Sequence, residues 1–433
     1  MRYNVLSRAF ASVSAESLPN LRNRPVSKTV LMLTPGFPGE MPLFTRGLSE
    51  QGATVLGVSN TPVQDLPDIA RRHLSDYLQA PDLFTNPEVA IEQIRRWLGS
   101  RTVDRVCCLW EPGVEIAAQI REALGVPGQS YHQALRFRNK DLMKQALAEG
   151  GVRVPHHAIA STPAEVWAAA EQVGYPLIIK PIAGAGSMDT FRCDDAADVK
   201  QAIAQLGHVA VVDVEEFIDG EEYTYDTVCA GGDIKYFHIA FYRPRPLIAR
   251  TNEWISPQTL TYKNVDDPKL AGGRAMGEQV LKVLGYDTGF THMEWYRKAD
   301  GEAVFGEVAA RPPGARTVDL MNYSGDMDLF NGWAEAELHG TFSQPIERKY
   351  NTACITKRAH GQGRIQRIEG LEQLRQRFGD AICVVDLLPI GTPRRDWKST
   401  LLSDGYVTLR HPDWDTTIAM ADAVGTDLNL YAG

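Results

Sequence analysis

The sequence lacks several features that would assign it to a specialised class of protein. No apolar run approaches the ~18 residues that a membrane-spanning helix needs. The six cysteines show no metal-type spacing, and the adjacent Cys107 and Cys108 lie in an apolar run typical of reduced core residues. Basic residues are outnumbered by acidic ones, 45 to 54, and the net charge of −9 argues against a general binder of nucleic acid or anionic membranes. We therefore expect a cytoplasmic protein with neither kind of partner.

What the sequence does have is the composition of a globular protein with several domains. Its 433 residues are 44% hydrophobic and 23% charged, and a chain of this length exceeds a single ordinary core. Residues 1–27 contain four arginines and several serines, faintly like a transit peptide, but no clear amphipathic pattern. We interpret them as an N-terminal extension.

Residues 28–127 alternate between the patterns of buried strands and amphipathic helices. The strands are expected at 28–34, 53–58 and 103–109, and the helices around Leu43–Leu48, at 91–98 and at 114–124. This alternation predicts a parallel α/β domain. Ligand clefts in such sheets lie beyond the carboxyl ends of the strands, so the loops 35–41 and 110–113 are expected to face a cleft.

The rest of the chain predicts an α+β arrangement. From about 128 to 345 we expect a helix at 139–150, a Thr162-capped helix at 163–173, and strands at 177–180 and 209–217, followed by hairpin-like segments. Residues 346–433 form a smaller α+β unit. The predicted fold class is therefore α/β and α+β.

The most informative feature is a pair of glutamates, Glu294 and Glu307, on either side of a hairpin signal. Asp300-Gly301 lies between two alternating apolar runs, and a two-residue turn there would pair the two glutamates directly. Their Cβ atoms would then be ~5 Å apart on one face of the sheet. Such carboxylates suit a divalent cation, above all Mg²⁺ with nucleotide phosphates. The alternative is two solvated glutamates on a surface hairpin.

Two further segments could bind a nucleotide. Lys180 ends an apolar strand and precedes a loop of small residues that includes Gly184, Gly186 and Ser187, whose amides could cradle phosphate. The loop matches neither a Walker A nor a dinucleotide motif, so an ordinary turn with a solubilising lysine stays open. The second segment, Glu215-Glu216-Phe217-Ile218 with Glu222, offers an apolar slot and carboxylates for a purine and a ribose, or else an acidic surface hairpin.

Taken in chain order, these segments resemble a known nucleotide site. Lys140, Lys180-Pro181, Gly184–Ser187, Glu215–Ile218, Glu222, Glu294 and Glu307 with Arg311 are similar to the ATP-grasp superfamily, and within it to carboxylate–amine ligases of the L-amino-acid-ligase kind. The resemblance implies an α/β domain over 28–127, a two-lobed ATP-grasp domain over 128–345 with a lid at about 155–212, and a C-terminal unit over 346–433 that completes the ligase.

The resemblance also implies roles for individual residues. Lys140 and Lys180 would contact the α- and β-phosphates of ATP, the lid loop would close over the γ-phosphate, and Glu215 with the backbone near Phe217 and Ile218 would bind adenine. Glu216 belongs to the same adenine-binding segment, and Glu222 would hold the ribose. Glu294 and Glu307 would bind Mg²⁺, with Mn²⁺ as an alternative ion, and Arg311 would steady the transferred phosphoryl group. Arg311 could instead pair structurally with one of these glutamates.

One position departs from the family pattern. The family commonly has asparagine two residues after the second metal glutamate, and this chain has Ala309. The number of bound metal ions is therefore an open point of the prediction.

The function implied is ATP-dependent joining of a small carboxylate, such as an amino acid or peptide-like acid, to an amine. His292, on the same strand face as Glu294, and Arg316 are candidate substrate contacts, or else a core histidine and a surface arginine. An alternative is a carboxylase resembling biotin carboxylase, but Arg-Pro-Pro-Gly-Ala-Arg stands where that family has Gln-Val-Glu-His. A non-enzymic nucleotide-binding protein is a third option. Homodimers are common among proteins of this kind.

Overall fold

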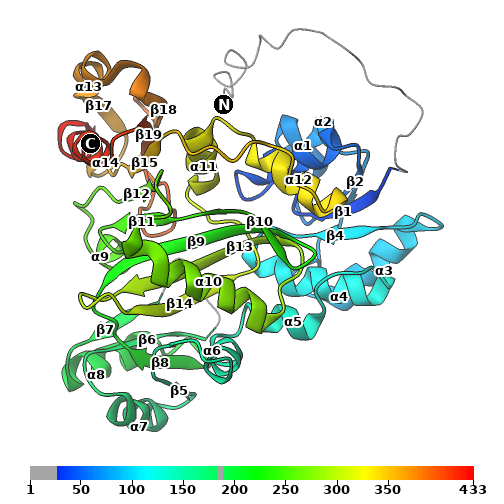
Figure 1. Ribbon diagram of the computed structural model, residues 1–433, viewed down its shortest axis with the longest axis horizontal. Helices are drawn as coiled ribbons and strands as arrows, with labels where there is room; N and C mark the ends of the chain where they lie inside the picture. The colour runs from blue at the N-terminus through cyan, green and yellow to red at the C-terminus, as the bar shows by residue number, and fades with distance from the viewer. Residues whose placement is uncertain (1–26, 183–188) are drawn as a thin grey trace.

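The N-terminal part of the chain forms a parallel α/β layer. The computed structural model describes residues 27–182 and 189–433, so the predicted loop Gly184–Ser187 and the extension before Ser27 lie outside the described residues (Figure 1). Four parallel strands lie in the order β3-β2-β1-β4; three of them, β1, β2 and β4, match the predicted strands, and β3 was not predicted. The elements are β1 (Thr29–Leu33), α1 (Met41–Glu50), β2 (Thr54–Ser59), α2 (Asp68–His73), β3 (Asp76–Gln79), α3 (Pro87–Leu98), β4 (Arg105–Cys107) and α4 (Val114–Leu124).

A small antiparallel sheet follows, after the connecting helices α5 (Tyr131–Leu135) and α6 (Lys140–Glu149). Thr162 and Glu165 form a capping box at the start of the helix predicted for 163–173, and the helix has those bounds. The strands lie in the order β5-β8-β6-β7. The elements are β5 (His157–Ala160), α7 (Pro163–Val173), β6 (Leu177–Pro181), β7 (Phe191–Cys193), α8 (Ala196–Gln205) and β8 (Val212–Glu216).

The centre of the molecule is a nine-stranded sheet that runs through two of the predicted units (Figure 1). Its order is β14-β13-β9-β11-β12-β15-β19-β18, with β10 paired to β9. The last three strands come from the chain beyond residue 345, so the boundary predicted there falls between strands of one sheet. The strands are β9 (Glu221–Ala230), β10 (Asp233–His238), β11 (Ala240–Arg243), β12 (Gln258–Thr261), β13 (Gly289–Arg297), β14 (Ala303–Ala309), β15 (Asn351–Thr356), β18 (Ile382–Leu387) and β19 (Gly405–His411).

The remaining elements are helices around this sheet and a separate three-stranded sheet in the order β16-β20-β17. Phe44 of α1 packs edge-on against Phe330 and Trp333 of α12, which joins the N-terminal layer to the centre. No helix in the described part of the chain has both the length and the apolar character to cross a membrane. The elements are α9 (Pro246–Thr251), α10 (Ala271–Leu284), α11 (Thr317–Gly325), α12 (Leu329–His339), β16 (His360–Gly361), β17 (Ile365–Glu369), α13 (Leu371–Phe378), α14 (Trp414–Asp427) and β20 (Asn429–Ala432).

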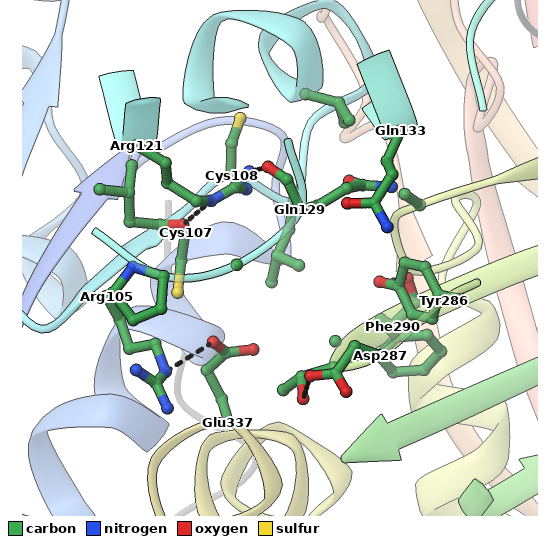
Figure 2. A pocket seen from close by; sticks show the side chains of 18 of the residues that line it. Arg105, Cys107, Cys108, Arg121, Gln129, Gln133, Tyr286, Asp287, Phe290 and Glu337 are labelled. Atoms are coloured by element: carbon green, nitrogen blue, oxygen red, sulfur yellow. Dashed lines mark hydrogen bonds and ion pairs between the residues drawn. The ribbon is translucent and has the colours of Figure 1, made fainter. Parts of the chain in front are cut away.

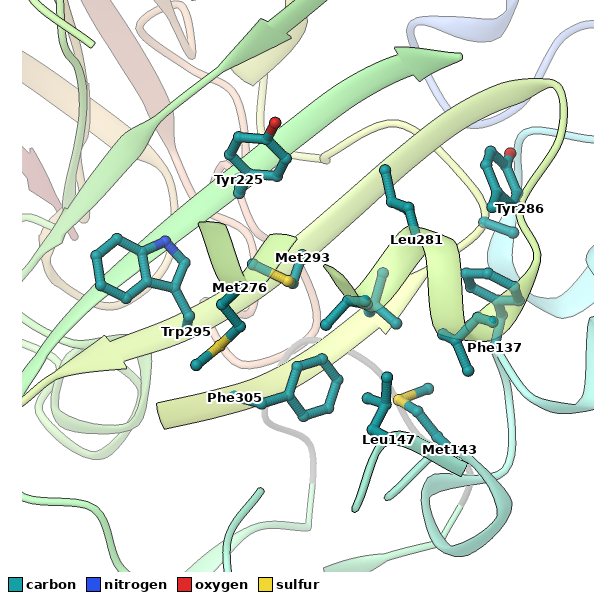
Figure 3. Packing of buried hydrophobic residues seen from close by; sticks show 14 of the residues in the cluster. Phe137, Met143, Leu147, Tyr225, Met276, Leu281, Tyr286, Met293, Trp295 and Phe305 are labelled. Atoms are coloured by element: carbon teal, nitrogen blue, oxygen red, sulfur yellow. The ribbon is translucent and has the colours of Figure 1, made fainter. Parts of the chain in front are cut away.

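One face of β9, β13 and β14 is apolar and packs against α6 and α10. Figure 3 shows Trp295, Phe305 and Met293 in this cluster beside residues of both helices. Two glycines on α10 allow the close approach: a Cβ on Gly273 would lie 2.1 Å from the Trp295 ring, and one on Gly277 would lie 2.3 Å from Tyr225. Because strand side chains alternate between faces, the intervening residues point to the opposite side, where the polar residues gather.

Candidate active site

Glu294 and Glu307 lie directly opposite each other in the β13–β14 hairpin, as the sequence predicts. The predicted two-residue turn is wrong, however, because Lys298 N–H bonds to Glu302 O at 2.9 Å and leaves a three-residue loop. Gly301, with φ of +90°, takes the left-handed position that such a loop requires. A bulge between Glu294 and Trp295 restores the register by leaving Gly306 unpaired. The turn and the bulge each shift the pairing by one residue, and the two shifts cancel.

Each carboxylate of this pair has a polar neighbour. Lys140 Nζ donates to Glu307 Oε1 at 3.2 Å. Glu294 Oε1 lies 3.4 Å from both Tyr242 Oη and His292 Nε2. Burial alone would raise the pKa of Glu294, but His292 next to it lowers that pKa below its usual value. This lowered pKa favours the ionised form of Glu294, the form that can bind a cation.

His292 is held between two carboxylates on the polar face of the sheet. Its Nδ1 lies 2.5 Å from Asp226 Oδ1, and Thr224 Oγ1 donates to the other oxygen of Asp226 at 2.6 Å. Burial opposes protonation, yet the charge of Asp226 raises the pKa of His292 to about 9. The residue is therefore an imidazolium whose two nitrogens both face carboxylates, and its predicted contact with substrate stays a prediction.

A buried lysine that the sequence prediction missed supports the next part of the site. Lys144 lies one helical turn after Lys140 on α6 and bonds to Asp213 Oδ2 at 2.5 Å and to Glu215. Lys180 Nζ donates to the other oxygen of Glu215 at 2.5 Å. Burial would raise the pKa of Glu215, but the two ammonium groups lower it. Both Glu215 oxygens thus already accept from lysines, whereas the sequence assigned this carboxylate to adenine.

The rest of the predicted adenine segment points in two directions. Glu216 lies on the opposite face of β8 from Glu215 and accepts from Arg153 at 2.9 Å, away from the lysine cluster. The ring centroid of Phe217 lies 4.1 Å from the guanidinium carbon of Arg192 and 4.9 Å from that of Arg245. Ile218 is buried next to it.

Arg245, also missed from the sequence, connects this segment to Glu222. It donates to Ile218 O at 2.8 Å and to Glu222 Oε2 at 3.2 Å. Burial and the nearby charge of Glu294 raise the pKa of Glu222 to about 8. With a pKa of about 8 this carboxyl group is largely protonated at neutral pH, so it can both donate a hydrogen bond to a sugar hydroxyl and accept one from it.

Two loops of the N-terminal domain contact the segment that follows β14, and their expected position at a cleft stays a prediction. Arg311 Nε donates to Glu111 Oε2 at 2.5 Å, so Arg311 pairs with neither of the two hairpin glutamates. Glu40 accepts from the backbone N–H of Arg316 at 3.2 Å. The Arg316 side chain forms an ion pair with Asp319 at 2.6 Å, and this carboxylate compensates the positive charge of the largely buried guanidinium.

The donor set suits a cation that takes most of its ligands from substrate. Among residues 27–182 and 189–433, no group of three or more His, Cys, Asp or Glu side chains could hold a metal. The carboxylates that could bind a cation here are therefore the opposed Glu294 and Glu307, and Ala309 offers no further ligand.

Two domain families match the chain in sequence. They are the ATP-grasp N-terminal domain, over residues 51–128, and the ATP-grasp domain, over residues 137–243. These two segments are ATP-grasp domains.

Similar ATP-grasp proteins include named ligases and synthases. The L-arginine-specific L-amino acid ligase of Bacillus subtilis is 27% identical over 246 residues, 55% of this chain and 59% of that protein. Dapdiamide A synthase of Enterobacter agglomerans is 25% identical over 275 residues, 60% of this chain and 63% of that protein. The match thus spans less than two thirds of the length of each of these curated relatives.

The fold of this ATP-grasp chain is shared with solved structures over nearly its whole length. The crystal structure of an L-amino acid ligase from Bacillus licheniformis superposes with a TM-score of 0.77 at 20% identity, covering 94% of this chain and 99% of that one. Phosphoribosylglycinamide synthetase from Anaerococcus prevotii superposes with a TM-score of 0.69 at 15% identity, covering 94% and 100%. The predicted fold class is confirmed.

Proposed function

We propose that this ATP-grasp chain is an ATP-dependent ligase that activates a small carboxylate as an acyl phosphate and joins it to an amine. The observation that carries the proposal is the directly opposed pair Glu294 and Glu307, with Lys140 bonded to Glu307. The names of the relatives, an L-amino acid ligase and a dapdiamide synthase, support an amino acid or peptide-like acid as substrate.

Mg²⁺ fits the hairpin pair. This ion usually binds through one or two protein carboxylates and takes its other ligands from substrate phosphates and water, which is what the opposed Glu294 and Glu307 allow. When bound there, it would neutralise charge on the phosphates of ATP. Ala309 supplies no third ligand, so Glu294 and Glu307 are the residues that would hold the ion.

The cationic side chains of the chain would position the phosphates. Lys140 and Lys180 each lie against a carboxylate, at 3.2 and 2.5 Å, and could exchange that partner for phosphate oxygens. The γ-phosphoryl group would pass from ATP to a carboxylate oxygen of the substrate, leaving ADP. The amine would then attack the acyl carbon and expel phosphate. Both steps depend on alignment and charge neutralisation rather than on a protein nucleophile.

We propose that the acyl donor binds where the N-terminal loops meet the end of β14. Arg311 is fixed there by Glu111, and the backbone of Arg316 is fixed by Glu40. Arg311 would steady the phosphoryl group between donor and acceptor. Arg316 and His292 would lie at the edges of the substrate pocket.

The test is phosphate release from Mg·ATP across a panel of single amino acids, amino-acid pairs and bicarbonate, with mass spectrometry of each active mixture. The proposal predicts release that needs both a carboxylate and an amine, and a product heavier than either by their sum less one water. Release that needs bicarbonate would identify a carboxylase instead. ATP binding without release in any mixture would favour the non-enzymic alternative.

A further inference from the structure

A polar cavity lies between the N-terminal domain and the central sheet, apart from the pair Glu294 and Glu307. Its volume is about 290 Å³, and Figure 2 shows the side chains that surround it. One wall comes from β4 and the segment before α5, and the other from the loop before β13 and from α12. Glu294, Glu307 and Arg311 are not among its lining residues.

The cavity has a cationic side. The Arg121 guanidinium donates to two backbone carbonyls, Val106 O at 3.2 Å and Gln129 O at 2.7 Å. No ion pair joins it to a carboxylate within residues 27–182 and 189–433. Neutral carbonyls orient the guanidinium, and no carboxylate of the described residues lies close enough to form an ion pair with it, so an anionic group entering the cavity would find a fixed partner.

The cavity has an acidic side as well. Glu337 of α12 lies across the space from Arg121 and Gln129 in Figure 2. Its nearest cation is Arg105, with Nε 3.6 Å from Oε1, which is longer than a hydrogen bond. Burial raises the pKa of Glu337 above its usual value, and the charge of Arg105 only partly offsets that effect.

Two buried donors at the cavity have no protein acceptor. The side-chain Nε2 of Gln129 and the indole Nε1 of Trp333 are unpaired within the described residues, although both side chains line the cavity. Trp333 is 1% exposed. Buried donors normally find a partner, so these two point to a ligand or ordered water with acceptor atoms.

We propose that this cavity is a second small-molecule site that binds a free α-amino acid, with its carboxylate toward Arg121 and Gln129 and its ammonium toward Glu337. The cavity is lined by two cationic side chains, Arg121 and Arg105, and by two acidic ones, Glu337 and Asp287. Both charges of a zwitterion would therefore find a partner, whereas a simple anion would also face the carboxylates. The volume lies at the small end of the range for ligand pockets, ~300–1,000 Å³, and suits one amino acid rather than a nucleotide. This site is separate from the proposed active site and does not depend on its assignment.

The proposal is tested by calorimetric titration with free amino acids, each compared with its deaminated acid and with its carboxamide. Titrations are done on wild type, on Glu337→Gln and on Gln129→Met, which removes the side-chain amide with its unpaired donor. We expect at least one amino acid to bind wild type, and Glu337→Gln to weaken it about tenfold or more through loss of the charged partner. Glu337→Gln should not weaken binding of the deaminated acid, because that ligand has no ammonium group and its carboxylate would no longer face the charge of Glu337.

Two controls separate this site from the active site and from nonspecific effects. Glu92→Gln, an exposed change on α3, should bind like wild type. Titration in a Glu307→Gln background should leave cavity binding intact, because Glu307 does not line the cavity. The proposal is overturned if no amino acid binds, if neither cavity variant weakens binding, or if binding is lost in the Glu307→Gln background. Equal affinity of wild type for the amino acid and its deaminated acid would also overturn it.

Discussion

Arg311 Nε donates to Glu111 Oε2 at 2.5 Å, and Arg138 Nη1 donates to the other oxygen of the same carboxylate at 2.6 Å. Glu111 is 6% exposed, so one buried charge joins the N-terminal domain, the segment before α6 and the end of β14. Arg311 is also the residue that we propose to steady the phosphoryl group. Its position relative to the N-terminal domain is therefore set by Glu111.

The ion pair at Glu111 predicts a specific dependence of stability on pH. Burial would raise the pKa of Glu111, but Arg311 and Arg138 lower it to about 2 from the usual 4.5. Because the folded-state pKa is depressed, the stabilisation is present above pH 4.5 and is lost as the pH falls toward 2. Its full size is roughly 3 kcal/mol.

The measurement is the free energy of urea unfolding of wild type and Glu111→Gln at several acidic pH values. The gap between the two proteins should be largest near neutral pH and should shrink as the pH is lowered from about 5 to about 3. Comparing the two proteins cancels the titration of the other carboxyl groups. A gap independent of pH would show that Glu111 titrates normally.

The proposed metal ligands predict a loss of turnover without a loss of fold. Glu307→Gln and Glu294→Gln should each reduce Mg·ATP-dependent phosphate release by about 100-fold or more, because charge neutralisation at the phosphates is lost. Glu302→Gln, an exposed change in the same hairpin, is the matched control and should retain activity. Wild-type turnover in Glu307→Gln would contradict the metal assignment.

The two lysines that bond to Glu215 are expected to affect different properties, Lys144 mainly the stability and Lys180 mainly the activity. Lys144→Met leaves Asp213 and Glu215 sharing one lysine in a buried setting, so we expect a loss of about 3–5 kcal/mol in unfolding free energy. Lys180→Met should cost less stability because its side chain is 13% exposed, against 1% for Lys144, but it should abolish phosphate release.

Urea unfolding and phosphate release of the two variants, measured side by side, separate these roles. If Lys144→Met were as stable as wild type, the buried pair would not be the support described above. If Lys180→Met retained activity, its proposed contact with phosphate would be wrong.

The bulge in the hairpin predicts that a small change at Gly306 disturbs the site. A Cβ there would lie 2.9 Å from Glu294 O, so Gly306→Ala must shift the backbone that aligns Glu294 with Glu307. We expect phosphate release to fall by about tenfold or more, with an altered dependence on Mg²⁺ concentration. Gly301→Ala is the matched control in the same hairpin.

Gly301 has φ of +90° but no heavy atom closer than 3.9 Å to an added Cβ, so its replacement adds strain only at the turn. That variant should lose about 1 kcal/mol of stability and keep its activity. Equal loss of activity in both variants would mean that the hairpin as a whole, rather than the bulge, controls the site.

The sequence predicted best where local interactions decide the structure. The helix α7 begins at its capping box, and α4 ends at Gly125 in the left-handed conformation, both as expected. The Glu294–Glu307 pairing was also predicted, although from a turn that the structure does not have. Asp-Gly is the signal of a two-residue turn, and the compensating bulge at Gly306 depends on contacts across the hairpin.

The residues that were missed are those whose partners are distant in sequence. Lys144 reaches Asp213 and Glu215 from another element, and Arg245 reaches Glu222. The sequence spacing contained part of this information, because Lys144 follows Lys140 by one helical turn and Asp213 shares a strand face with Glu215. The pairing between them depends on how α6 docks against β8, which no local pattern specifies.

The nine-stranded sheet has a consequence for how the molecule can be divided. β15 pairs along its length with both β12 and β19, so the chain beyond residue 345 is hydrogen-bonded into the ladder that ends at the carboxylate hairpin. A protein cut at residue 345 would leave Gln258–Thr261 as an open edge with unpaired backbone groups, a template for aggregation. The two parts are one folding unit, and a stable fragment has to keep both.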